Sequence, residues 1–577
     1  MHHSREKVGP VSSTVPRMFK LLVLVIAASA LLAAPALASR IDREARADAH
    51  ASAFKKAPAD LKIPVRDPAP PAGAQVLKYK FGPMKINPGQ NLIDIDVQKE
   101  RPNVDGWIVG FRPGLIDAKT GKSPSVTEVH LHHAVWLVDL KPTFAAGEEK
   151  TNFDTPAGFG WRYTTKQSWL INHMIHDLVG QSHEVYITYT LYFIPDTAPE
   201  AAGIHEVKTQ WMDVEGVKPY PVFNALKGSG TKGKFTFPDQ AKNPYPDRPA
   251  DRPRNTWVAD RDATLVATAG HLHPGGLWTD LNLTRDGKTV RLFRSRANYY
   301  DPSGAISWNV AMSASAPDWR IHIKKGDILS TNATYDTTKA SWYEVMGIMP
   351  TAITLDDEGG VDPFTGKVDQ TDYLTHGELK ENRDPASTRK VNPAYNNANK
   401  LRQGPFVSTV TIRSFTYRPG DLTLPGKKGL PPSVAQGSSI TFVNKDQPTT
   451  VRFHTITACL APCNQGSGIG FPLADGKGLF DSGELGYGPT INTAGLYSGD
   501  GDLNVPSTPV IDTPADEADC ANGGPGAITK AIATGCVGTT TWKTPTTLSP
   551  GTYTYFCRIH PFMRGAFRVV PKTKIKD

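Results

Sequence analysis

The sequence contains 577 residues, of which 39% are hydrophobic and 21% are charged. A chain of this composition can build packed cores, which excludes a wholly disordered protein, and its length allows about three or four domains. The formal net charge is +8. No long run of Lys or Arg accompanies this charge, so it does not indicate a nucleic-acid-binding protein.

The chain opens with an export signal. Lys20 precedes the apolar run 21–34, and the segment from Ala36 to Ala38 has the small-x-small pattern of a cleavage site. The run is shorter than the roughly 20 residues that span a bilayer. We therefore expect residues 1–38 to be a signal peptide, cleaved near Ala38, and the mature protein to be secreted or periplasmic. No later apolar stretch is long enough to predict a membrane span.

Strand-like segments dominate most of the remaining chain. Residues 39–75 are rich in Ala, Pro and charge, which indicates a leader or linker. Over 76–203 and again over 204–355, β-branched and aromatic residues alternate with polar ones between turn signals. We expect two consecutive β-sandwich domains there. A polar, Pro- and Asn-rich stretch, 356–404, is predicted to be a linker.

Histidines are concentrated in these two domains. His130 and His132 are two residues apart on a predicted strand and share one face, whereas His133 points the other way unless the strand is bulged. In the second domain, His271 and His273 share a face in the same way. Such a pair can chelate one metal ion when a third ligand comes from elsewhere. Taken alone, the pattern also fits ordinary surface or core histidines.

The order of the histidine motifs along the chain can be compared with that of known families. The motifs are Val-His-Leu-His132-His133-Ala-Val-Trp, Ala-Gly-His271-Leu-His273-Pro-Gly-Gly-Leu, Lys324-Lys-Gly-Asp-Ile-Leu and Trp342-Tyr-Glu-Val-Met346-Gly-Ile-Met349. In this order they resemble the copper type II, ascorbate-dependent monooxygenases, the family of peptidylglycine α-hydroxylating monooxygenase. The resemblance implies tandem β-sandwiches that carry two type 2 coppers.

The first of these coppers would be held at His132 and His133 and would supply an electron. The family takes a third histidine from a later strand, but the corresponding strand here, 185–194, contains none. We expect His176 to replace it.

The second copper would be held by His271, His273 and Met346, and the resemblance implies that it binds and reduces dioxygen. Met346 is preferred over Met349 because its flanking residues match the family better. The family then hydroxylates an aliphatic carbon of an organic substrate. The family is rich in disulfides, whereas this chain has no cysteine before Cys459, and no substrate-binding motif of the family is visible.

The five cysteines all lie in the last quarter of the chain. Thiols of an exported protein tend to pair, and an odd number leaves one over. Cys557 stands apart from the others, which lie in loops rich in Gly and Pro. The local pairing is Cys459–Cys463 and Cys520–Cys536, and the two other connectivities stay open.

Soft and borderline metal ligands surround the cysteine that stands apart. Cys557, His560 and Met563 lie within seven residues, and a thiolate, an imidazole and a thioether suit copper. Zinc would more often show a second Cys or His nearby. A blue-copper site needs a second histidine, and His454 is the only other one after His376. The alternative is a buried free thiol beside a turn histidine.

The segment Cys557-Arg-Ile-His560-Pro-Phe-Met563-Arg-Gly resembles the copper loop of amicyanin-like cupredoxins, and His454-Thr-Ile-Thr resembles their upstream ligand strand. The likeness covers about 405–571. It implies a Greek-key β-sandwich with a type 1 copper held by His454, Cys557, His560 and Met563. This ligand set suits both oxidation states of copper, so it indicates a one-electron carrier.

The sequence as a whole predicts an all-β protein: tandem monooxygenase-like sandwiches followed by a cupredoxin sandwich. The leading interpretation is a secreted copper protein whose type 1 domain feeds electrons to the monooxygenase-like module. Its partners would be a redox protein or small reductant, together with O2 and an organic substrate. The alternatives are an active C–H hydroxylase and a non-catalytic copper-binding protein. An insertion at about 490–540, longer than small cupredoxins carry, would cover the copper end or a partner surface.

Overall fold

The structure of the chain is a computed structural model, and it describes most of the chain after the leader. The predicted signal peptide lies outside the described residues, and so do the side chains of both predicted disulfides. The residues left undescribed are 1–62, 91, 127, 179–180, 219, 246–252, 301–303, 306–307, 339–340, 384–397, 447–452, 460–479, 484, 487–489, 493–509, 512–539, 558–559, 561–562 and 575–577.

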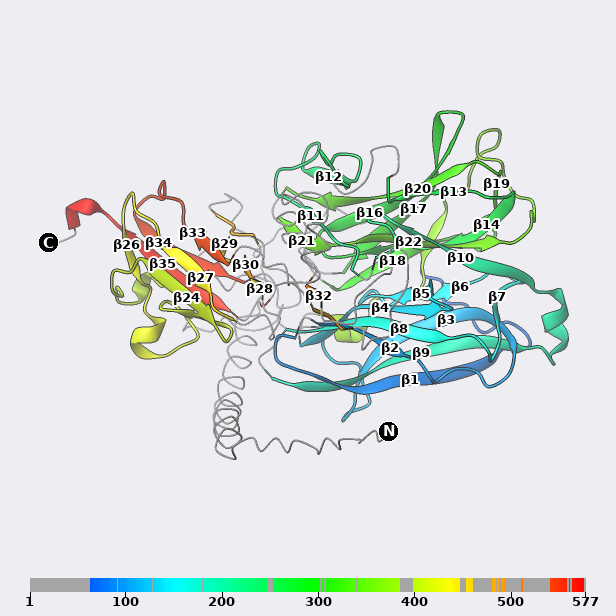
Figure 1. The fold of residues 1–577 in the computed structure, drawn as a ribbon, viewed down its shortest axis with the longest axis horizontal. Helices are drawn as coiled ribbons and strands as arrows, with labels where there is room; N and C mark the ends of the chain where they lie inside the picture. Colours follow the sequence, from blue (N-terminus) through cyan, green and yellow to red (C-terminus); the bar gives the residue numbers. More distant parts are fainter. Residues whose placement is uncertain are drawn as a thin grey trace, which may run out of the picture.

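The regular structure is almost entirely β, which confirms the predicted fold class (Figure 1). Short 3-10 turns supply the rest of the regular structure in the described part of the chain. These turns are η1 (Pro199–Gly203), η2 (Lys380–Asn382), η4 (Ala398–Lys400), η5 (Gly426–Gly429) and η7 (Lys572–Lys574). No helix of the described residues is long and apolar enough to cross a membrane.

One ten-stranded sheet runs through both of the first two predicted domains. Its path is β1 (Gln75–Ile86), β9 (His183–Pro195), β3 (Gly106–Asp117), β7 (Phe159–Tyr163), β10 (His205–Asp213), β22 (Gly347–Thr354), β14 (Ala263–Thr268) and β19 (Ile321–Ile323), with β6 (Phe153–Asp154) beside β3 and β15 (His271–Leu272) beside β22. The parallel pairing of β7 with β10 carries the sheet across the boundary expected at 203. That boundary stays a prediction.

Two further sheets cover the halves of this one. The six-stranded sheet is β32 (Val510–Ile511), β31 (Thr490–Asn492), β2 (Leu92–Val97), β8 (Trp169–Asp177), β4 (Val129–Val138) and β5 (Lys141–Ala146). The seven-stranded sheet is β12 (Lys234–Phe237), β20 (Ile328–Asp336), β16 (Gly276–Arg285), β17 (Lys288–Tyr299), β18 (Val310–Ser315) and β23 (Asp372–Leu374), with β13 (Thr256–Val258) beside β20. A short pair joins β11 (Phe223–Ala225) to β21 (Trp342–Val345).

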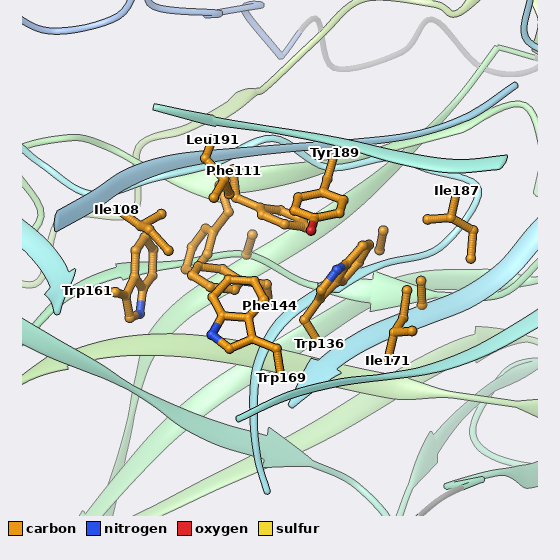
Figure 2. Packing of buried hydrophobic residues seen from close by; sticks show 14 of the residues in the cluster. Ile108, Phe111, Trp136, Phe144, Trp161, Trp169, Ile171, Ile187, Tyr189 and Leu191 are labelled. Carbon is orange, nitrogen blue, oxygen red and sulfur yellow. The ribbon is translucent and has the colours of Figure 1, made fainter. Parts of the chain in front are cut away.

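The first sandwich packs around aromatic side chains (Figure 2). The ring of Phe111 stacks on Phe144 and meets Trp136 edge-on, with both centroid distances 4.9 Å. β8 is buried along its whole length because its two faces enter different cores. Ile171 and Ile175 enter this aromatic core, while Met174 on the opposite face enters a second cluster shared with β22. The six-stranded sheet is therefore an inner layer, and a polar side chain on its second face is also buried.

The C-terminal sandwich has two four-stranded sheets around its own core. The first sheet is β25 (Thr416–Arg418), β24 (Thr409–Arg413), β27 (Thr441–Asn444) and β33 (Thr541–Lys543). The second is β26 (Ser433–Ala435), β35 (Arg564–Val570), β34 (Gly551–Phe556) and β29 (Thr457–Cys459), and β28 (Phe453–His454) pairs with β30 (Leu485–Gly486). Two short strands depart from this unit: β31 and β32 add to the sheet of the first sandwich, where β31 pairs with β2.

Candidate metal centres

One end of the C-terminal sandwich brings together a thiol and two imidazoles. His454 ends β28, Cys557 follows β34 directly, and His560 lies in the loop that leads into β35. The sulfur of Cys557 lies 3.9 Å from Nδ1 of His454 and 3.6 Å from Nδ1 of His560. All three side chains are buried, with at most 2% of each exposed. We call this group the Cys557 centre.

The loop after β34 is closed by its own backbone. Met563 donates its N–H to the carbonyl oxygen of His560 at 2.8 Å, and Cys557 donates to the carbonyl oxygen of Met563 at 3.3 Å. This turn holds the thiol and the histidine on one side of the loop. Met563 is fully buried in the same core cluster as Cys557.

Residues around the Cys557 centre orient its donors. The backbone N–H of Thr455 points at the Cys557 sulfur at 3.4 Å, as expected for a group that stabilises a thiolate. Nε2 of His454 lies 2.9 Å from a carboxylate oxygen of Asp446, which leaves Nδ1 facing the sulfur. Burial alone would lower the pKa of His454, but its hydrogen bonds to Asp446 and Cys557 outweigh burial and raise the pKa. Phe415 packs edge-on against both imidazoles.

The chemistry of these donors fits copper. Two imidazole nitrogens and a thiolate are borderline and soft ligands, and a thioether is buried beside them. Within the described ranges, His454, Cys557 and His560 are the one group of three or more His, Cys, Asp or Glu residues whose ligand atoms all lie within 4.8 Å of each other.

Six buried histidines form a second group, on the second face of the inner sheet. We call it the histidine cluster. Its members are His130, His132, His133, His176, His271 and His273.

A bulge in β4 explains how neighbouring histidines share this cluster. Leu131 lies opposite Ile175 and His133 lies opposite Met174, so His132 is the extra residue. Leu131 and Ala134 both enter the aromatic core, and the two histidines between them turn away from it. A regular strand would send His133 to the opposite face.

The structure brings histidines from the two predicted sites next to each other. Nδ1 of His132 and Nδ1 of His133 are 3.2 Å apart. The ring of His132 lies 4.5 Å from that of His176 and 4.4 Å from that of His273, measured between centroids. His173, on the opposite face of β8, instead pairs with Asp96. His176 is thus the β8 histidine that reaches His132.

Hydrogen bonds to residues outside their own strands fix the orientation of two members of the cluster. Nε2 of His133 lies 3.1 Å from the side-chain oxygen of Asn172, and Nδ1 of His271 lies 2.9 Å from a carboxylate oxygen of Glu149. The remaining nitrogen of each ring is left for another partner. Nε2 of His271, Nε2 of His273 and both ring nitrogens of His130 are buried without a hydrogen bond to any described residue. Buried nitrogens in this state are suited to binding a metal ion.

Burial keeps five of the six histidines of the cluster uncharged. It lowers the pKa of His133 and of His176 to about 3. For His130, His132 and His273, burial and the neighbouring histidines lower the pKa well below its ordinary value. A neutral imidazole offers a lone pair, so these rings are ready ligands at physiological pH.

Met346 lies between β21 and β22 and is buried. His271 pairs with Ile348 and Leu272 with Gly347, so the register places Met346 opposite His273. Met349, its predicted rival, lies in the core of the second sandwich. Met346 therefore holds the position next to the cluster.

Two small cavities adjoin the cluster. One of ≈ 20 Å³ is lined by His132, His176 and His273, and one of ≈ 30 Å³ is lined by His133 and Met346. Each has room for about one to three water-sized occupants, because a water needs roughly 10–15 Å³ by this measure. This space suits an ion rather than an organic substrate.

Comparisons with known proteins give little further information. No protein-family model matches the chain, and no curated protein matches it. Several solved structures are similar to parts of it. Three of them are a copper-containing nitrite reductase from Thermus scotoductus SA-01 (12% identity, 53% of this chain and 55% of that one, TM-score 0.14), the major capsid protein P2 of bacteriophage PM2 (10%, 50% and 100%, 0.21) and recombinant N-glycanase F (9%, 54% and 98%, 0.15). The chain spans about half the length of the first. TM-scores this low do not indicate a shared fold.

Proposed function

We propose that this chain is an exported copper protein in which a type 1 copper at the Cys557 centre exchanges single electrons. Its ligands would be His454, Cys557 and His560, with Met563 as a weaker thioether ligand. The observation that carries the proposal is the buried thiol flanked by two Nδ1 atoms at 3.9 and 3.6 Å. When bound, copper would supply reversible one-electron chemistry. The chain's own residues would hold its geometry nearly constant between oxidation states.

The protein residues around the Cys557 centre have separate roles in this function. Thr455 donates a backbone hydrogen bond to the sulfur and stabilises its thiolate form. Asp446 holds the ring of His454 in place. Phe415 covers both imidazoles and keeps water from the ligands.

We propose that the histidine cluster holds further copper, as the monooxygenase resemblance implies. His132, His133 and His176 would form the first site, and His271, His273 and Met346 the second. Two nitrogens on one ion at roughly 2.0–2.1 Å in a tetrahedral arrangement are about 3.3 Å apart. The 3.2 Å between Nδ1 of His132 and Nδ1 of His133 supports a shared ion there.

Two functions of the cluster compete, and a different observation favours each. The second proposed site offers only two imidazole nitrogens and one thioether, which would leave a bound copper with an open position, and this favours an O2-using C–H hydroxylase. The small volume of the adjoining cavities favours a copper-binding protein without turnover. Electron transfer at the Cys557 centre is common to both.

Copper content and colour test the proposal. Full-length protein loaded with copper and oxidised is expected to show an intense visible band and about three bound coppers, two of them colourless. Cys557→Ala should lose the band and one copper, and His271→Ala should keep the band and lose a colourless copper. His205→Ala, at an exposed histidine paired with Glu358, is the matched control. A wild-type protein that stays colourless after oxidation contradicts the proposal.

Oxygen uptake separates the two functions of the cluster. With reductant present, a hydroxylase should consume O2 in the wild type and much less in His271→Ala. Equal, slow uptake in both proteins supports binding without turnover.

A further inference from the structure

A turn of the first sandwich reaches the Cys557 centre. It connects β1 to β2, and its backbone closes between Asn87 and Gln90. Gly89 in this turn is buried, and its carbonyl oxygen lies 3.4 Å from Nε2 of His560. Because Nδ1 of His560 faces the Cys557 sulfur, Nε2 carries the proton and donates a hydrogen bond to the carbonyl oxygen of Gly89. The outer edge of His560 is therefore covered by a distant part of the same chain.

The close approach depends on the glycine. Gly89 has a φ of +62°, in the left-handed region, and a Cβ atom there would overlap the ring of Phe415 and come within 3.3 Å of His560. Any larger residue must push the turn away from both rings. The turn can therefore approach His560 this closely because residue 89 has no side chain.

The turn continues directly into the sheet that carries the histidine cluster. β2 begins at Leu92, three positions after Gly89. Across the sheet, Ile93 lies opposite Met174, and Met174 lies opposite His133. One row of residues on β2, β8 and β4 therefore connects the turn with a member of the cluster. All three strands are hydrogen-bonded neighbours in this sheet.

A second contact holds the C-terminal part against this sheet. The edge of β2 that faces away from β8 pairs in parallel with β31, so that Ile93 lies opposite Ile491. The turn is therefore tethered to the C-terminal part of the chain at two places, the Gly89 contact and this strand pairing.

We infer that the contact between Gly89 and His560 is the internal port through which the Cys557 centre exchanges electrons with the histidine cluster of the same chain. The inference rests on the proposed function. With copper bound at both places, the Cys557 centre would be oxidised by one electron and the cluster would be reduced by one electron. The route runs from His560 through the Gly89 carbonyl and β2 to the row that ends at His133. No bond is broken on the way, and the proton on Nε2 stays in place.

Flash reduction of the full-length copper protein tests the port. A photoexcited flavin adds less than one electron per molecule under anaerobic conditions, and the visible band is followed. We expect a fast phase in which the bleached band recovers at a rate independent of protein concentration. Gly89→Val should lose this phase while keeping the band. Gly121→Val is the matched control, because Gly121 has a similar φ of +66° and no atom within 4 Å of its Cβ position.

The outcomes are distinct. A wild type without a visible band refutes the proposed function. A visible band without an internal recovery phase, or an unchanged phase in Gly89→Val, overturns the port alone. If Gly89→Val folds poorly, Gly89→Ala is used in its place.

A readout on metal-free protein checks the contact itself. Diethyl pyrocarbonate should modify His560 slowly in the wild type and in Gly121→Val, and faster in Gly89→Val, as measured by peptide mass spectrometry. Equal modification in all three proteins contradicts the covered edge.

Discussion

At the scale of single residues, the proposed copper ligands could be picked out from the sequence, whereas the residues that support them could not. Cys557, His560 and Met563 are close in the chain, so their spacing is itself the signal. Asp446 and Gly89 contribute through contacts that only the folded chain creates. An aspartate in a loop and a glycine in a turn are too common to stand out in a sequence.

Asp446 should matter for metal retention. Its carboxylate holds Nε2 of His454, and loss of a partner that orients a metal ligand typically weakens affinity about 10–100-fold. We expect this loss in Asp446→Ala, measured by competition with a copper chelator. Asp260→Ala, at an exposed aspartate paired with Arg261, should bind copper as the wild type does. Equal affinity in both variants would show that His454 needs no support.

Met563 should set the reduction potential rather than the colour. Leucine fills a similar volume but offers no ligand atom, and an apolar site favours the copper ion of lower charge. Met563→Leu is expected to keep the visible band and raise the potential in a redox titration. A lowered potential would count against an axial thioether.

At the scale of elements, the strand pattern left open whether the strand that carries His133 is bulged, and the structure shows that it is. A period of two places His133 with the aromatic core, and the extra residue His132 reverses this. The sequence also does not reveal that the second face of β8 is buried, because that burial depends on packing against β22. Glu149, which holds His271, follows β5 in the polar segment Gly-Glu-Glu-Lys. The composition of this segment predicts exposure to solvent, but the structure buries it.

This buried face should make the metal-free protein sensitive to acid. The pKa of His133 and of His176 is lowered to about 3 in the folded state, against about 6.5 in the unfolded chain. The unfolded state therefore binds more protons between these values, and stability falls as the pH falls from about 6.5 towards 3. From pH 7.5 to 5.5, each histidine should cost about 1.4 kcal/mol in the free energy of unfolding.

Urea unfolding at the two pH values measures this loss. His176→Gln should remove about one histidine's share of the pH dependence, whereas His205→Gln at the exposed site should leave it unchanged. An identical pH dependence in wild type and His176→Gln would contradict the assignment.

At the scale of the whole molecule, the ten-stranded sheet links the first two sandwiches into one unit. The sequence predicted two domains because its pattern of strands repeats, and the pairing of β7 with β10 cannot be read from such a pattern. We expect the sandwiches to lose structure together. Trp136→Ala, which should cost about 3–5 kcal/mol in the first core, is expected to speed amide exchange in β16 and β17 of the second. Val76→Ala, at an exposed position, is the control.

The pairing of β2 with β31 also sets an order of events during synthesis. Leu92 leaves the ribosome long before Thr490, its partner across the strand pair, exists. Until then, the N–H and C=O groups along one edge of β2 have no strand to pair with. Such an exposed strand edge can associate with other chains. We therefore expect a shortened chain that ends before Thr490 to be more prone to aggregate than the full-length protein.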